Sequence, residues 1–265
     1  MKSIYLVGLL ISLFMIAGDC YADENPVTIV PASLGIDTSF YKKYVDADGI
    51  PVVTSQHVSD EALIAAGKII TGMLSKRKDV ADAMKSKGCK VMIIGEKEAT
   101  LELPEYRHLG KTKEEYDFWN KRARGFGGAP EHETSASCGE ENIICLPGDR
   151  YEGENILIHE FAHIIHMVGI VNVEPDFDDR LTALMDKAKE KGLWEKTYAL
   201  ENKEEYFAET VQSFFNCNRY SEEPNGVHNQ INRREKLKVY DPDMYHFLQQ
   251  YFAEADIEIC NVIHD

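Results

Sequence analysis

The chain has 265 residues, of which 44% are hydrophobic, 10% aromatic and 28% charged, and its formal net charge is −16. This composition is typical of a globular protein with one sizeable core, or with two lobes that share a cleft. The negative charge argues against nucleic acid and anionic membranes as partners, because both would repel it. The charge either keeps the protein soluble or favours basic substrates.

Residues 1–22 have the pattern of a secretory signal peptide. Lys2 supplies the positive end, and residues 4–17 form an apolar stretch too short to span a bilayer. Small residues at the right offsets predict cleavage after Ala22. We therefore expect residues 23–265 to form a single exported, soluble and monomeric domain, extracellular or, in a bacterium, periplasmic. No later stretch is expected to cross a membrane.

Five cysteines remain after the predicted cleavage, and export permits disulfides between them. Cys138 and Cys145 bracket a short loop and are the first expected pair. Cys217 and Cys260 are the second, which leaves Cys89 unpaired. A zinc-thiolate site is not expected because no C-x-x-C pair occurs.

The first half of the mature chain mixes strand and helix patterns. Residues 23–56 are expected to form an extended entry segment with a turn at 46–49. Helices are expected over 60–76, 80–87 and 111–121, and a buried strand over 90–95. Residues 122–130 are rich in glycine and predict a surface or cleft-rim loop. Residues 142–146 predict a short strand, either an ordinary core strand or a sheet edge to which an extended peptide could pair.

The second half is predicted to be mainly helical. Helices are expected over 153–167, 175–191, 202–215 and 241–252, with a helical turn over 231–239. Gly169 is expected to end the first of these helices.

The first helix of this half carries the sequence H-E-F-A-H. His159 and His163 are four residues apart, so a helix places both imidazoles on one face. Glu160 lies about 100° further round the helix, beside them. This arrangement is typical of a catalytic zinc site with one ion per chain. A chance occurrence is the alternative, and the apolar flanking residues argue against it: Ile156, Ile158, Phe161, Ala162, Ile164 and Ile165.

The third ligand must come from elsewhere, because the extended metzincin motif fails. It requires Gly at position 166 and a ligand at position 169, where this chain has His166 and Gly169. The helix over 202–215 offers Glu205 and Glu209 on one face. Two carboxylates are costly to bury without a partner, and a cation removes that cost.

We therefore expect Glu205 to be a ligand and Glu209 to hold one of the histidines from behind. A solvated acidic face is the alternative, and Glu201 and Glu204 are the competing carboxylates. His166 is expected to pack beside the site or support it. His228 is a weaker candidate that could reach the cleft from the C-terminal segment.

The two segments H-E-F-A-H and E-E-Y-F-A-E together resemble the gluzincin metallopeptidases, and within them the group of the anthrax toxin lethal factor catalytic domain. The likeness covers residues 155–216. It implies a zincin-like α+β domain of two lobes, with a small mixed sheet, an active-site helix and a helical C-terminal half. It also implies that Tyr198, seven residues before Glu205, stabilises the transition state, and Asn202 matches the family as well.

The resemblance implies a secreted zinc endopeptidase that acts on a protein or peptide. Glu160 would be the general base toward a zinc-activated water. The chain lacks the G-x-M-E-N stretch of gluzincin aminopeptidases, which favours an endopeptidase. Two other functions are compatible with the motif: a secreted interaction module that binds zinc without turnover, and a zinc hydrolase of a non-peptide bond.

Overall fold

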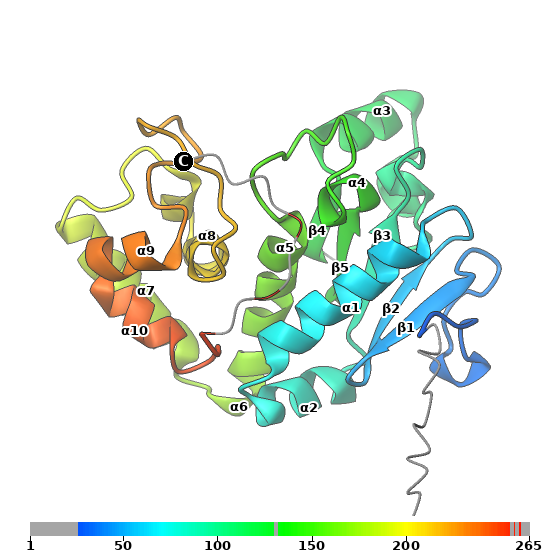
Figure 1. The fold of residues 1–265 in the computed structure, drawn as a ribbon, viewed down its shortest axis with the longest axis horizontal. Helices are drawn as coiled ribbons and strands as arrows, with labels where there is room; N and C mark the ends of the chain where they lie inside the picture. Colours follow the sequence, from blue (N-terminus) through cyan, green and yellow to red (C-terminus); the bar gives the residue numbers. More distant parts are fainter. Residues whose placement is uncertain (1–25, 130–131, 255–256, 258–259, 261–265) are drawn as a thin grey trace, which may run out of the picture.

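The computed structural model describes residues 26–129, 132–254, 257 and 260. The predicted signal peptide lies outside these residues. The described chain is α+β, as expected, with one mixed sheet of five strands in the order β1-β2-β3-β5-β4. Figure 1 shows the sheet on one side, the late helices α7 to α10 on the other, and α5 between them.

The sheet begins within the segment that we expected to be an extended entry. β1 (Lys43–Ala47) and β2 (Ile50–Thr54) form an antiparallel hairpin. The turn at 46–49 is confirmed: Asp48 and Gly49 have φ values of 55° and 89°, as tight hairpin turns require. β2 then pairs in parallel with β3 (Lys90–Ile94), the predicted buried strand.

The two strands nearest the central helix were not predicted. β5 (His132–Gly139) pairs in parallel with β3, and β4 (Gly125–Ala129) pairs antiparallel with β5 as the edge of the sheet. The prediction of a loop over 122–130 is therefore wrong over most of its length. Glycine has the same backbone hydrogen-bonding groups as any other residue, so β4 can pair with β5 without alternating apolar and polar side chains.

The strand predicted over 142–146 is also wrong, because Asn142 belongs to the short helix α4 (Glu140–Ile143). The Asn142 side chain occupies the local backbone groups. Its Oδ1 accepts from the Ile156 N–H at 2.7 Å, and its Nδ2 donates to the Glu154 carbonyl at 2.9 Å. These bonds tie α4 to the start of the next helix and replace strand pairing.

The remaining predicted helices are confirmed within a few residues. They are α1 (Asp60–Leu74), α2 (Lys78–Ser86), α3 (Lys113–Arg122), α7 (Phe177–Glu190), α8 (Lys203–Phe214), α9 (Arg234–Tyr240) and α10 (Pro242–Leu248). Ser59 caps α1 by accepting the Ala62 N–H at 3.2 Å. One apolar cluster of buried residues extends from β1 and β2 to α10.

The central helix, residues 156–173, is longer than predicted. α5 (Ile156–Ile164) continues through a π-helical turn, η4 (Ile165–Ile170), into α6 (Val171–Val173). Gly169 does not end it. A Cβ at Gly169 would lie 2.6 Å from a methyl carbon of Val80, so this glycine lets the central helix approach α2 closely.

By length and composition alone, the central helix is apolar enough to cross a membrane, although we expected this of no stretch after the signal peptide. A buried core helix has the same composition. In this helix, 61% of the 18 residues are buried inside the fold, and it contacts both the sheet and α8. Its apolar character is therefore accounted for by core packing.

The disulfide joins Cys145 to Cys260, with a Cα–Cα distance of 5.8 Å. Both expected pairings are thus wrong. Cys138 and Cys217 are buried thiols, as is Cys89, and Cys138 lies within β5 at the sheet interior. The C-terminal segment returns to the loop after α4, a contact that loop spacing could not indicate. A disulfide is consistent with an oxidising, extracellular environment.

Candidate metal centre

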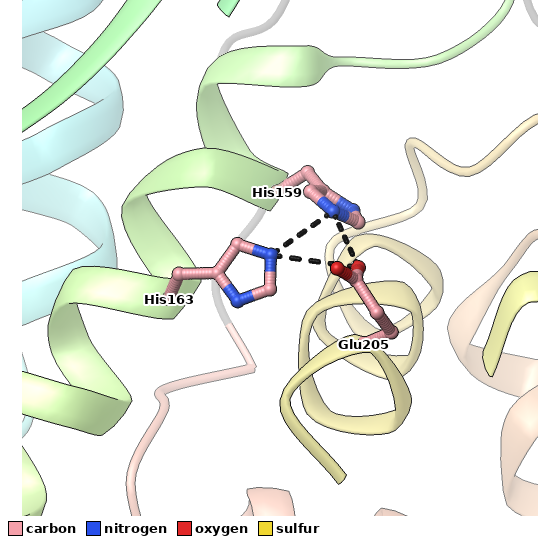
Figure 2. A group of neighbouring side chains, drawn as sticks. All are labelled: His159, His163 and Glu205. Carbon is pink, nitrogen blue, oxygen red and sulfur yellow. Dashed lines mark hydrogen bonds and ion pairs between the residues drawn. The ribbon is translucent and has the colours of Figure 1, made fainter. Parts of the chain in front are cut away.

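The two histidines of the motif project from α5 toward α8 (Figure 2). Asn155 caps this helix, because its side chain accepts the Ile158 N–H at 2.9 Å. His159 Nε2 and His163 Nε2 lie 3.2 Å apart. Glu205 Oε2 lies 3.1 Å from the first nitrogen and 3.5 Å from the second. The three residues predicted as ligands are therefore brought together at one point.

Asn202 places Glu205 at the start of α8. Its side chain caps that helix by accepting the Glu205 N–H at 2.8 Å, so Asn202 acts on the helix start and not within the cluster itself. The competing carboxylates point elsewhere. Glu204 pairs with Lys203 at 2.9 Å, and Glu201 is exposed.

The spacing of these three atoms fits a small cation. Nitrogen and oxygen ligands at about 2.1 Å from a tetrahedral zinc ion lie roughly 3.4 Å from one another. The observed separations are 3.1, 3.2 and 3.5 Å. Among the described residues, His159, His163 and Glu205 are the group of His, Cys, Asp or Glu side chains that could hold a metal ion. Two histidines with one glutamate suit zinc.

Carboxylates dominate the electrostatics of the cluster. Burial disfavours charge on His159, but the hydrogen bond to Glu205 and the nearby charge of Glu160 outweigh burial and raise the pKa of His159 to about 10. Burial opposes ionisation of Glu205, yet the hydrogen bonds to His159 and His163 hold its pKa well below the usual range. Excess negative charge of this kind favours a cation.

His159 is held from behind chiefly by Gln212. Its Nδ1 lies 2.9 Å from Gln212 Oε1 but 3.6 Å from Glu209 Oε1, the acceptor that we expected. The Gln212 amide donates to the Asn155 carbonyl at 3.0 Å, which turns its oxygen toward the histidine. Gln212 follows Glu205 by two helical turns, so periodicity could have indicated this role.

Glu209 belongs to a buried polar group behind the cluster. It is 4% exposed, and its Oε2 accepts from Asn218 Nδ2 at 3.0 Å. His228 is buried there too, 3.9 Å from Glu209 and 3.6 Å from Glu154. His228 therefore lies behind the metal ligands and does not line the cleft.

His166 is a packed histidine. Its Nε2 lies 2.7 Å from Asp178 Oδ1, and its ring contacts Phe177 and Phe207. Burial outweighs the hydrogen bond to Asp178 and lowers the pKa of His166, which favours the neutral ring. It faces α7 and makes no contact with the three ligand atoms.

A cavity of about 490 Å³ opens in front of the cluster. The predicted catalytic residues Glu160 and Tyr198 both line it, together with Glu205. Burial and the hydrogen bond to Glu205 raise the pKa of Tyr198 to about 12, so its phenol is a hydrogen-bond donor at neutral pH. The other lining residues are Leu109, Trp119, Arg122, Ala123, Gly125, Phe126, Gly127, His159 and His163.

The edge strand β4 touches the backbone of α5 at Glu160. A Cβ on Gly127 would lie 2.2 Å from the Glu160 carbonyl oxygen, and one on Gly125 would lie 2.6 Å from the Ser137 carbonyl oxygen. These glycines therefore allow an approach that no other residue permits. Burial raises the pKa of the Glu160 carboxyl, while a hydrogen bond from the Gly127 backbone acts against this. The glycine-rich stretch thus supports Glu160, a role that sequence reasoning missed.

No protein-family model matches the chain, and no curated protein matches it in sequence.

Proposed function

We propose that the protein is a secreted zinc-dependent metalloendopeptidase of the gluzincin type, with a zincin-like fold. One observation carries the proposal. Two histidines from α5 and a glutamate from α8 converge on one point, next to a half-buried carboxylate and a phenol in the same cavity. These are the parts that metal-assisted hydrolysis requires.

His159, His163 and Glu205 would hold the ion. Zinc bound there would polarise the scissile carbonyl and make water a stronger nucleophile at neutral pH. Three protein ligands leave a coordination position open for this purpose, as catalytic zinc sites do.

Glu160 is the proton carrier in this proposal. It lines the cavity beside the three ligands, and burial raises the pKa of its carboxyl above the usual value. A carboxylate with a raised pKa is the better base, so Glu160 accepts a proton from the attacking water. The same carboxyl group then delivers the proton to the leaving amine.

Tyr198 is the oxyanion donor. Its pKa of about 12 keeps the phenol protonated, and it lines the same cavity as Glu160, from the 3-10 turn η5 (Tyr198–Leu200) before α8. A single donor of this type typically lowers the barrier by about 3 kcal/mol. A zinc-binding module without turnover would have no use for a base and a donor at these places.

The test combines metal analysis of the purified protein with cleavage of a degenerate peptide library. Glu160→Gln is the control, because it removes the base and leaves all three ligands. We expect about one zinc ion per chain in both forms, and cleavage only with Glu160 present. Absence of zinc would refute the metal assignment. Zinc without cleavage that depends on Glu160 would support a binding module or a hydrolase of another bond.

A further inference from the structure

Arg122 is an unpaired cation on the wall of the cavity. It is exposed at the C-terminal end of α3, and it is the one lysine or arginine among the described residues that line this space. Within the described part of the chain, no hydrogen bond or ion pair engages its guanidinium. The positive charge of Arg122 acts to lower the pKa of the Tyr198 phenol.

Arg124, two residues further on, shows what a structural arginine looks like in this fold. Its Nε lies 2.6 Å from Glu141 Oε1, and its Nη2 lies 2.8 Å from Glu141 Oε2 and 2.9 Å from the Gly95 carbonyl. Arg124 therefore uses its hydrogen-bond donors within the protein. Arg122 keeps all five of its donors for a group that enters the cavity.

An apolar surface adjoins this cation. Trp119 precedes Arg122 by three residues on α3, so the two side chains lie on one face of the helix. The Trp119 ring packs edge-on against Phe126 of β4, with centroids 5.8 Å apart, and Leu109 lines the same space. A ligand side chain that covers these rings would bring its neighbouring groups close to the guanidinium.

In the metal-bound form, the cavity lining would carry a charge opposite to that of the whole protein. A divalent cation on the three ligands would cancel the charges of Glu205 and Glu160, and Arg122 would then leave the lining with one net positive charge. The overall charge of −16 consequently gives no guide to the ligand, although a preference for basic substrates was one of the two interpretations that it allowed. Local charge at short range outweighs distant, screened charge.

We propose that the substrate is a peptide segment in which a carboxylate lies next to a large apolar side chain. The apolar side chain contacts Trp119 and Phe126, and the carboxylate accepts hydrogen bonds from Arg122 in the planar, paired geometry that guanidinium favours. The carboxylate comes either from an acidic side chain or from the free C-terminus of the peptide. This inference deepens the proposed peptidase function and rests on it.

The test uses synthetic peptides with a fixed Phe and with Glu, Gln or Lys at each neighbouring position. One set is blocked at both ends, and a second set has a free C-terminal carboxylate. Binding is measured on the zinc-loaded Glu160→Gln protein by the change in tryptophan fluorescence, which is assigned to Trp119 because Trp194 is only 2% exposed and does not line the cavity. Cleavage of the same peptides is measured with Glu160 intact.

We expect the carboxylate peptides to bind about tenfold more tightly than their amide counterparts, the typical gain of a hydrogen bond to a charged group. Arg122→Gln should reduce this ratio to about one, and Arg122→Glu should reverse the preference toward Lys. Lys121→Glu is the matched control, because it makes the same charge change on the same helix at a side chain that does not line the cavity. It should leave the ratio unchanged.

Equal binding of carboxylate and amide peptides, or a preference that survives Arg122→Gln, would overturn the inference, as would the failure of every peptide to bind. Cleavage without such a preference would overturn the inference alone. A preference that depends on Arg122 but comes with no cleavage would support the inference and overturn the peptidase function. The blocked and free sets identify which carboxylate is recognised.

Discussion

The cavity has two walls that are built in different ways. The metal wall consists of the facing sides of α5 and α8, with Tyr198 just before α8. Its two histidines are buried and the Glu205 side chain is 14% exposed; Gln212 contacts His159 from behind, and Asn202 caps the helix that carries Glu205. The rim wall consists of α3 and β4. No residue of α3 is buried, and among the described residues no hydrogen bond or ion pair holds the Arg122 side chain.

The difference indicates that the two walls have separate roles. Side chains that must keep one geometry during a reaction are fixed by packing and by second hydrogen bonds. Side chains that contact a ligand directly must first be exposed. We therefore expect changes in the metal wall to alter metal affinity or kcat, and changes in the rim wall to alter KM and the choice of peptide.

The largest effect is expected from Glu205→Ala. It removes a ligand, so zinc affinity should fall well beyond the ~10–100-fold typical of residues that only support ligands, and activity should be lost. Competition with a chelator measures the affinity. Glu209→Ala should lower zinc affinity by only that ~10–100-fold. Glu204→Ala, next to the ligand but paired with Lys203, is the control and should bind zinc normally. A larger loss of zinc affinity with Glu209→Ala than with Glu205→Ala would make Glu209 the ligand and Glu205 the supporting residue.

Tyr198→Phe tests whether the metal wall contributes more than metal binding. Loss of one oxyanion donor should lower kcat by about 100- to 1000-fold with an unchanged zinc content. Because the pKa of Tyr198 is about 12, its phenol stays protonated across neutral and mildly alkaline pH. The ratio of wild-type to Tyr198→Phe rates should therefore remain constant from about pH 7 to pH 9. A ratio that falls across this range would contradict the assignment of a protonated donor.

Gly127→Ala tests whether the two walls act separately, because Gly127 belongs to the rim wall but contacts α5. Its Cβ would lie 2.2 Å from the Glu160 carbonyl oxygen, and a backbone atom cannot move aside as a side chain does. β4 must shift and release Glu160, so we expect kcat to fall by about 100-fold while zinc stays bound.

The control for this change is Gly72→Ala in α1. Among the described residues, the nearest atoms to the added Cβ are side-chain carbons of Ile257, at 3.0 Å or more, and a flexible side chain can move aside, so activity should be nearly normal. Wild-type kcat in Gly127→Ala would show that β4 does not position the base.

Gln212→Leu tests the support of His159. Leucine keeps the volume and removes the acceptor 2.9 Å from Nδ1, so zinc affinity should fall by about 10- to 100-fold. Gln212→Glu restores an acceptor and should recover most of the affinity, which a purely structural role would not explain. If leucine has no effect, Glu209 must serve as the acceptor instead.

The metal wall was largely predictable because its pattern is local. His159 and His163 fall on one helix face by periodicity alone, and Glu205 stood out as a carboxylate on an apolar helix. The fold class and most helices followed from the same periodicity. The pairing of these residues across α5 and α8 was expected from the cost of burying two carboxylates on one helix face, and the geometry brings the three side chains together.

The rim wall was predicted poorly because its structure depends on contacts distant in sequence. Gly127 looked like part of a loop because its reason for being glycine lies 33 residues away, at Glu160. The bond between Cys145 and Cys260 spans 115 residues, so no loop spacing could reveal it. Gly169 was likewise expected to end the helix, but its lack of a side chain instead allows close packing against α2.

The smallest effect, and the sharpest test of the rim wall, is expected from Trp119→Ala. The change removes much of the apolar surface beside Arg122, so KM should rise by about tenfold for peptides with a large apolar residue, while kcat stays within about twofold. Phe118→Ala is the matched control. Phe118 neighbours Trp119 on the same helix, is 57% exposed and does not line the cavity, so KM should not change. Because α3 buries none of its residues, neither substitution should shift the thermal midpoint by more than a few degrees. A fall in kcat at constant KM would instead mean that Trp119 acts through Phe126 on β4 and Glu160, which would join the two walls into one catalytic unit.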